Sequence, residues 1–376
     1  MTPTPDDEFE RTVIVSRPRA PEAAAPDVGH YLVVGKAGEP GKRVELGTEP
    51  AAIGRDPRQA IVLSDTEASR MHARVSIVKG EAVAEDLGST NGTFLDGRRL
   101  TAPATLKAGS VLRIGSHLLK YERRARLDVE RSEELNRDLD KAGTYVFSLL
   151  PPPLTTGRVL AEWRFVPSMQ LGGDAFGYYW LDADTFIFYL LDVSGHGVGS
   201  AMHSVAVLNV LRQRALPQVD FGNPAAVLTS LNARFQMDDH NGLFFTMGYG
   251  AYHAGRRTLT YGSAGHHPAY LVAADKSRRQ PLGIPALMIG VMPDLEYTVQ
   301  ETAVPAGSSV YLFSDGLFEV VTTAGTRWSQ SDFEPLLTAP SIPGTPESER
   351  LLQAVKQETG PVPLEDDASV MVLTFP

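Results

Sequence analysis

Hydrophobic and polar positions divide the chain into four parts of different texture. Residues 1–29 are rich in Pro, Ala and acidic residues, a composition typical of a disordered tail. Between residues 30 and 121, short apolar runs such as YLVV and ARVSIV alternate with turns that contain Gly, Pro and Asp. Short strands at this spacing predict an all-β sandwich.

Residues 122–150 form a highly charged stretch that ends at the prolines of positions 151–153. Apolar side chains recur in this stretch at spacings of four and three residues, which predicts a helical linker; they are Leu135, Leu139, Ala142, Val146 and Leu149. The stripe fits either a helix that docks on its own domain or a coiled coil that forms a homodimer, and two heptads are too few to decide between them.

Residues 151–376 mix long apolar strands with helices, as in an α+β domain. We expect one helix over residues 197–216, where apolar side chains share a face, and a second over residues 223–237. The second begins with Asn223 as its N-cap and Pro224 at its first helical position.

Three strand candidates in this part carry acidic residues at their ends. FIFYLLDV contains Asp192, SSVYLFSDG contains Asp315, and EDDASVMVLTF begins with Asp366 and Asp367. If the last strand is antiparallel to the other two, these carboxylates meet at one edge of a sheet. Asp174 lies in LGGDAFG, where glycines allow the backbone to approach a ligand closely.

Clustered carboxylates raise one another's pKa unless cations neutralise them. The chain has no cysteine, and oxygen ligands alone select hard ions such as Mg²⁺ or Mn²⁺. Two such ions about 3.5–4 Å apart can activate a water for in-line attack on phosphorus. A single Asp at a strand end is more often a turn former or helix cap, so this interpretation depends on the acids lying together.

Five motifs occur in the order and spacing of the SpoIIE/RsbU-like phosphatases, the bacterial branch of the PPM metal-dependent serine/threonine protein phosphatases. They are GGD (172–174), LLDVSGHG (190–197), AGHHPA (264–269), LFSDGLFE (312–319) and DDASVMVL (366–373). Residues 145–376 resemble that family. The resemblance implies an α-β-β-α sandwich over residues 151–376, with two Mn²⁺ or Mg²⁺ ions, that hydrolyses phosphoserine or phosphothreonine on proteins.

The same resemblance assigns roles to individual residues of the implied catalytic metal site. Asp192 corresponds to the aspartate that bridges both ions, and the backbone carbonyl of Val193 would bind one of them. Asp315 and Asp366 correspond to carboxylates on the other ion, and Asp174 to the acid of the first motif. The substrates of such enzymes include phosphorylated anti-sigma-factor antagonists, so a phosphorylated protein of that class is the expected substrate.

Departures from the family pattern keep two alternatives open. Gly177 stands where many relatives carry a second acid, His196 lies four residues past Asp192 rather than two, and no arginine takes the place of a phosphate clamp. An inactive phosphatase that acts as a phosphothreonine-dependent adaptor would fit these departures. The second alternative is a diguanylate cyclase, because GGDAF is one letter from the GGDEF signature of those enzymes. This alternative would leave the motifs at 312–319 and 366–373 unexplained. Adjacent histidines, as at positions 266 and 267, diverge and are poor metal ligands.

Three turn motifs of the N-terminal sandwich carry an arginine, hydroxyls and an asparagine: IGRD (53–56), SRMH (69–72) and DLGSTNGTFLDG (86–97). An arginine fork with hydroxyl donors suits a phosphate dianion. Residues 30–121 resemble a forkhead-associated (FHA) domain, a family that binds phosphothreonine peptides. The resemblance implies a structural role for Gly54 and His72, and it implies phosphothreonine binding by Arg55, Ser69, Arg70, Thr90 and Asn91.

The tail contains a β-prone patch, ERTVIVSR, with Thr12 at its centre. Acidic residues precede Thr12, and Val15 follows at the third position, where FHA domains commonly select a side chain. We therefore hypothesise that a serine/threonine kinase phosphorylates Thr12 and that an FHA domain binds it in cis or in trans.

Charge and hydropathy exclude other classes of function. The net charge of −10 argues against a nucleic-acid-binding groove. No window approaches the roughly 18 uninterrupted apolar residues of a membrane span, and the first residues lack the apolar core of a secretory signal. We expect a cytoplasmic protein.

Overall fold

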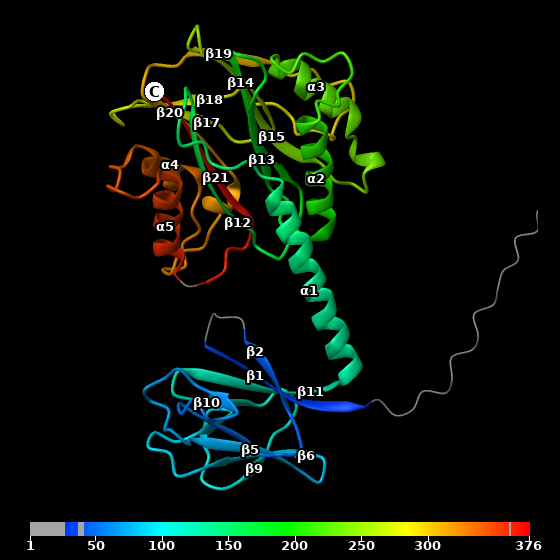
Figure 1. The fold of residues 1–376 in the computed structure, drawn as a ribbon, viewed down its shortest axis with the longest axis vertical. Helices are drawn as coiled ribbons and strands as arrows, with labels where there is room; N and C mark the ends of the chain where they lie inside the picture. The colour runs from blue at the N-terminus through cyan, green and yellow to red at the C-terminus, as the bar shows by residue number, and fades with distance from the viewer. Residues whose placement is uncertain (1–26, 37–40, 361) are drawn as a thin grey trace, which may run out of the picture. The chain divides into compact units, whose positions relative to one another are not determined.

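The structure is a computed structural model that describes residues 27–36, 41–360 and 362–376. Thr12 lies outside these residues, so the hypothesis about it stays a prediction. The chain forms two compact units, Met1–Glu133 and Glu134–Pro376 (Figure 1). Within the described part of the chain, no helix has the length and apolarity needed to cross a membrane.

The N-terminal unit is a β-sandwich, which confirms the predicted fold class. Its two sheets have the strand orders β2-β1-β11-β10-β7-β8 and β4-β3-β5-β6-β9. Alternate apolar side chains such as Leu32, Ile53 and Leu119 are fully buried in its core. The strands are β1 (Val28–Lys36), β2 (Lys42–Leu46), β3 (Ala51–Gly54), β4 (Ile61–Val62), β5 (Ala73–Val78), β6 (Glu81–Asp86), β7 (Phe94–Leu95), β8 (Arg98–Arg99), β9 (Ala104–Thr105), β10 (Val111–Ile114) and β11 (His117–Ala125).

The linker is a single helix, α1 (Arg126–Ser148). The negative charge of Asp128, in its first turn, interacts favourably with the positive end of the helix dipole. Of the predicted apolar stripe, Leu135 is 60% exposed, whereas Leu139, Ala142 and Val146 are partly buried. Phe147 packs its ring against Trp163. The C-terminal end of α1 therefore packs against the C-terminal unit. Because Leu135 is exposed, nothing tests the expected homodimer, and it stays a prediction.

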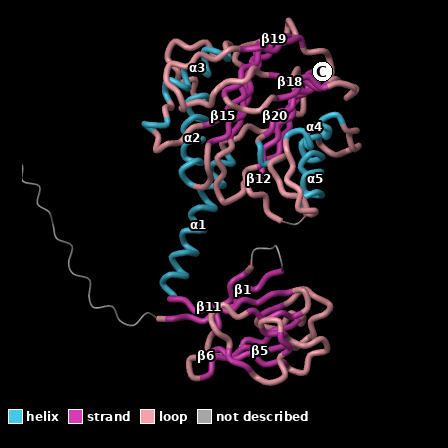
Figure 2. The backbone as a smooth tube through the Cα atoms, turned by 180° about the vertical axis from the view of Figure 1, so that it is seen from behind, coloured by secondary structure: helices cyan, strands magenta, loops and turns pink. Residues whose placement is uncertain are grey.

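The C-terminal unit is an α-β-β-α sandwich, as predicted. The sheet β13-β14-β15-β16-β19 is covered by two helices, α2 (Val198–Arg212) and α3 (Pro224–Arg234). The sheet β12-β21-β20-β17-β18 is covered by α4 (Gln330–Thr338) and α5 (Glu347–Thr359). Figure 2 shows the strands between these two helical layers. The strands are β12 (Leu160–Val166), β13 (Ala175–Trp180), β14 (Thr185–Val193), β15 (Phe245–His253), β16 (Thr258–Ala264), β17 (Ala269–Val272), β18 (Arg279–Leu282), β19 (Val299–Ala303), β20 (Ser308–Phe313) and β21 (Ala368–Phe375).

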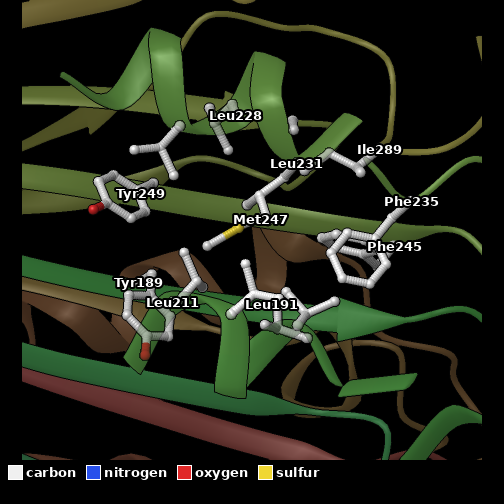
Figure 3. Packing of buried hydrophobic residues seen from close by; sticks show 14 of the residues in the cluster. Tyr189, Leu191, Leu211, Leu228, Leu231, Phe235, Phe245, Met247, Tyr249 and Ile289 are labelled. Atoms are coloured by element: carbon white, nitrogen blue, oxygen red, sulfur yellow. The ribbon is translucent and has the colours of Figure 1, made fainter. Parts of the chain in front are cut away.

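Strand β14 shows why the run FIFYLLDV is apolar throughout. Phe188 and Leu190 lie in the core between the two sheets, whereas Tyr189 and Leu191 lie in the core under α2 and α3 (Figure 3). A strand that is buried on both faces needs apolar residues at every position. Asp192 is the polar residue that ends this run.

The two predicted helices form, but both end earlier than expected. Helix α3 begins as predicted: the Asn223 side chain accepts a hydrogen bond from Ala226 N, and Pro224 is the first helical residue. It ends at Arg234, and α2 ends at Arg212. The residues after each end leave the helix, so apolar spacing extended the prediction past the true C-caps.

Candidate functional site

Four of the predicted acidic residues lie at strand ends of the C-terminal unit. Asp192 is the second-last residue of β14, and the antiparallel pairing of β13 with β14 places Asp174 opposite it. Asp315 begins the 3₁₀ turn Asp315–Leu317 that follows β20. Asp366 lies two residues before β21, which is antiparallel to β20 as expected.

The expectation that these acids share one sheet edge is wrong. Strand β14 belongs to one sheet, whereas β20 and β21 belong to the other. Both strand groups are apolar on two faces, so the sheets stack face to face instead of merging into one. The carboxylates therefore gather between the ends of two stacked sheets.

Asp174 is the most deeply buried acid of this group. Its side chain is 2% exposed, and neither carboxylate oxygen has a hydrogen-bond partner among the described residues. Burial raises the pKa of Asp174 well above its usual range, and the nearby charges of Asp192 and Asp367 raise it further. A buried carboxylate without a partner is costly, so this position favours a cation.

The pKa values of the other three acids are raised as well. Burial, followed by the charges of Asp315 and Asp366, raises the pKa of Asp192 to about 8. Burial and the charge of Asp366 raise the pKa of Asp315 to about 6, and burial also raises the pKa of Asp366. Each carboxylate thus makes its neighbours harder to ionise, and a divalent cation among them would remove that cost.

The donor chemistry fits a hard divalent ion, because every candidate ligand is an oxygen. Among the described residues, however, no three His, Cys, Asp or Glu side chains form a group that could hold a metal ion. The carboxylates would therefore need backbone or water oxygens to complete a coordination shell. The carbonyl of Val193 lies at this place: a Cβ added to Gly173 would come 3.0 Å from it.

Asp367, a strand-end acid to which the sequence assigned no role in the metal site, anchors the loop that presents Asp174. Its carboxylate accepts hydrogen bonds from Ser168 N at 2.7 Å, Ser168 Oγ at 3.0 Å and Gly173 N at 2.5 Å. Strand alternation could have indicated this position, because Met371 and Leu373, at the same parity, lie in the core between the sheets.

Gly177 has no room for the second acid that many relatives carry. A Cβ at this position would lie 2.3 Å from the Tyr189 hydroxyl oxygen. The buried tyrosine occupies the space that a side chain would need. The absence of an acid at position 177 is therefore a consequence of packing in this chain.

The histidine pair has a structural environment. The two nitrogens of the His266 ring are 2.8 Å from Thr246 Oγ1 and 3.0 Å from the Phe313 carbonyl oxygen. The neutral imidazole that satisfies both partners accepts from Thr246 and donates to Phe313. The His267 ring stacks on Phe313, with centroids 4.5 Å apart.

In the N-terminal unit, three turns bring the predicted phosphothreonine-binding residues together. Arg55 N donates to the Ser69 carbonyl at 3.0 Å, and Ser69 Oγ accepts from Thr90 N at 3.1 Å. Asn91 Nδ2 donates to the Glu67 carbonyl at 2.9 Å. Arg70 follows Ser69 in the chain. The side chains of Arg55 and Arg70 are exposed, and neither forms an ion pair with a described residue. The result is a cationic surface with hydroxyl donors.

Buried residues hold these turns in place. His72 is fully buried, and its Nδ1 accepts a hydrogen bond from Ser69 N at 3.0 Å. Burial would raise the pKa of Asp86, but hydrogen bonds from Ser89 and Thr93 hold it at about 2. Gly54 has no space for a side chain, because a Cβ would lie 2.3 Å from the Arg70 carbonyl oxygen.

Comparison with known families agrees with this fold and these motifs. The sequence model of the SpoIIE family (stage II sporulation protein E) matches residues 182–376, just over half of the chain, and that of the FHA domain matches residues 51–115. The chain belongs to the SpoIIE family and carries an FHA domain. The diguanylate cyclase alternative gains no support from these matches.

Individual relatives match each unit separately. The FHA domain-containing protein FhaB of Mycolicibacterium smegmatis is 41% identical over 93 residues, which cover 25% of this chain and 60% of the relative. The phosphoserine phosphatase RsbP of Bacillus subtilis is 28% identical over 198 residues, which cover 52% of this chain and 47% of the relative. This chain thus spans about half of the length of these relatives.

Among solved structures, the SiaA-PP2C domain of Pseudomonas aeruginosa has the same fold as the C-terminal unit. Its TM-score is 0.56 at 21% sequence identity, and the match covers 65% of this chain and 99% of that domain.

Proposed function

We propose that this chain is a metal-dependent protein serine/threonine phosphatase of bacterial signalling, targeted or regulated by its FHA domain. Membership of the SpoIIE family supports the reaction class. The observation that carries the proposal is Asp174, which is buried without a hydrogen-bond partner beside Asp192, whose pKa is raised to about 8.

The residues would divide the work as follows. Asp174, Asp192, Asp315 and Asp366, with the Val193 carbonyl, would hold two Mn²⁺ or Mg²⁺ ions. Such ions supply Lewis acidity and lower the pKa of a water that attacks the phosphate monoester.

Protein groups around the acids would fix this geometry. The Asp367 carboxylate holds Gly173 N, and through it the turn that presents Asp174. Partial burial of Asp192 at the end of β14 limits access of bulk water, which strengthens its interaction with a cation. These residues therefore position the acids before a substrate arrives.

The FHA domain would bind a phosphothreonine through the surface of Arg55, Ser69, Arg70, Thr90 and Asn91. An arginine meets a phosphate dianion with short, charge-assisted hydrogen bonds, and neither arginine is committed to an ion pair among the described residues. The ligand would be a phosphothreonine protein or the chain's own tail after a kinase has modified Thr12. The substrate of the phosphatase unit would be a phosphorylated protein, such as an anti-sigma-factor antagonist.

The test is release of phosphate from a mixed phosphoserine and phosphothreonine peptide pool by the full chain. We expect release that requires Mn²⁺ or Mg²⁺, stops with chelator and falls at least about a hundredfold in Asp192→Asn. The matched control is Asp238→Asn, which changes an exposed acid of the same unit and should leave the rate unchanged.

The adaptor alternative is favoured by one observation, the missing second acid at Gly177. It predicts binding of phosphothreonine peptides with no release of phosphate at any metal concentration. Titration of the full chain and of Arg55→Ala with a phosphothreonine peptide measures the FHA function independently. Loss of peptide binding in Arg55→Ala with unchanged phosphate release would show that the two units act through separate sites.

A further inference from the structure

The C-terminal unit contains a cavity of about 400 Å³ that the proposed reaction does not use. Its walls are the segment 148–152, which begins at the last residue of α1, the strand β13 and the C-terminal end of α2. Cavities of this size are typical of sites for small organic molecules. It lies at Gly177 and Tyr189, on the side of β14 that faces α2.

A buried hydroxyl without a partner lies in the wall of this cavity. Tyr189 is fully buried, and its hydroxyl oxygen makes no hydrogen bond with any described residue. Tyr249, whose ring stacks on Tyr189 at 6.0 Å, satisfies its own hydroxyl by donating to the Phe221 carbonyl. In Figure 3 both tyrosines lie at the opposite end of the cluster from Phe235. An unpartnered buried donor needs an acceptor, which a bound ligand can supply.

Two arginines line the same cavity. Arg212 and Arg214 belong to the end of α2 and the turn after it, and neither forms an ion pair with a described residue. The Arg214 guanidinium lies 4.9 Å above the Tyr179 ring. Its backbone has a φ of 53°, a left-handed conformation in which glycine is common after a helix. An arginine at such a position keeps a cationic side chain at the cavity despite the strained backbone.

We propose that this cavity binds a small organic anion with an apolar body. Arg212 and Arg214 bind its carboxylate or phosphate group, and the Tyr189 hydroxyl donates a hydrogen bond to a further acceptor atom. The apolar part of the ligand contacts Leu208 and Leu150, which also line the cavity. Two arginines, aromatic walls and the buried, unpartnered hydroxyls of Tyr179 and Tyr189 favour this class over a neutral or cationic ligand.

The position of the cavity connects a ligand to the rest of the unit. The segment 148–152 is fixed by hydrogen bonds from Tyr178 Oη to the Pro152 carbonyl at 2.7 Å and from Trp163 Nε1 to the Pro151 carbonyl at 2.9 Å. Strand β13, the opposite wall, begins directly after Asp174. An occupant would therefore contact both the end of the linker and the strand that carries an acid of the proposed metal site.

Calorimetric titration of the full chain tests the proposal, with chelator present so that the carboxylate site cannot capture the anion through a metal. The probes are phenylphosphonate, benzoate and inorganic phosphate, with benzyl alcohol as the neutral comparison. We expect phenylphosphonate or benzoate to bind at one site, and affinity to fall at least about tenfold in the double variant Arg212→Gln/Arg214→Gln. Arg256→Gln, which removes another exposed arginine, should bind like the wild type.

Tyr189→Phe supplies a second readout that a structural role would not give. It should weaken binding of the anion while the melting temperature of the ligand-free protein stays the same or rises, because the lost hydroxyl has no partner among the described residues. Three results would overturn the proposal. They are no binding of any of the three anions at about 10 mM, equal binding of benzyl alcohol, or equal affinity in the double-arginine variant.

Discussion

Asp192→Asn should stabilise the metal-free protein even though it should abolish the proposed activity. Burial and the charges of Asp315 and Asp366 raise the pKa of Asp192 from 3.8 to about 8. The ionised carboxylate of Asp192 therefore lowers the free energy of unfolding, and the neutral amide of Asn at this position does not carry that cost. A residue that exists to bind a cation is expected to cost stability when the cation is absent.

The size of the effect follows from the two pKa values of Asp192. A tenfold change in a protonation equilibrium corresponds to about 1.4 kcal/mol. A solution at pH 7 lies about three pH units above the pKa of the unfolded chain and still below the folded pKa, so about 4 kcal/mol is an upper limit. The cost is absent below about pH 4, grows as the pH rises towards 8 and is constant above it. The advantage of the variant over the wild type should follow the same course.

Chemical denaturation of the full chain in chelator, at several pH values between about 4 and 9, measures this difference. Asp238→Asn, the exposed control, should change the free energy of unfolding by less than about 0.5 kcal/mol. Added Mn²⁺ should stabilise the wild type and leave Asp192→Asn nearly unchanged. Destabilisation of the metal-free protein by Asp192→Asn, or an advantage that does not grow with pH, would refute the electrostatic account of the site.

Three further changes test the packing around the site. Asn232→Ala should cost about 2–4 kcal/mol, because Asn232 Oδ1 accepts from Gly290 N at 2.9 Å and the buried backbone groups would lose their partners. Burial lowers the pKa of His266 from 6.5 to about 4, so its unfolded form takes up a proton first and stability should fall by about 3 kcal/mol as the pH drops from 6.5 to 4. Gly177→Ala should destabilise the protein, because its Cβ would lie 2.3 Å from the Tyr189 hydroxyl oxygen.

All three are measured as differences in the free energy of unfolding of the full chain. Gly199→Ala is the control for Gly177→Ala, because no atom lies within 4 Å of a Cβ at that helical position. For His266, the comparison is His266→Gln, which should lose the acid-dependent component. Equal stability of Asn232→Ala and wild type, a flat pH response or a neutral Gly177→Ala would each contradict the corresponding packing argument.

The sequence allowed much of the fold to be predicted, because its periodicities report burial. The apolar run before Asp192 predicted a strand, and Asn223 with Pro224 placed the start of α3 correctly. Periodicity carries no signal for which strands pair, so the assignment of β14 to a different sheet from β20 and β21 was missed.

The acids of the candidate site could be predicted from the sequence, whereas the hydrogen bonds that hold them in place could not. Asp174 and Asp192 could be named from motifs, whereas the hydrogen bonds of Asp367 to Ser168 and Gly173 join positions far apart in the sequence. No local pattern encodes such a contact. The alternation of β21 gives Asp367 the same parity as Met371 and Leu373, which lie in the core between the sheets, but it does not reveal the partners of Asp367.

The most direct test of the central claim is the location of manganese in crystals of the full chain grown with Mn²⁺, from anomalous diffraction at the manganese edge. We predict two peaks between the ends of the two stacked sheets, in contact with the carboxylates of Asp192, Asp315 and Asp366, and no such peaks in Asp192→Asn. Manganese bound elsewhere, or no peak at these carboxylates in the wild type, would contradict the assignment of this site.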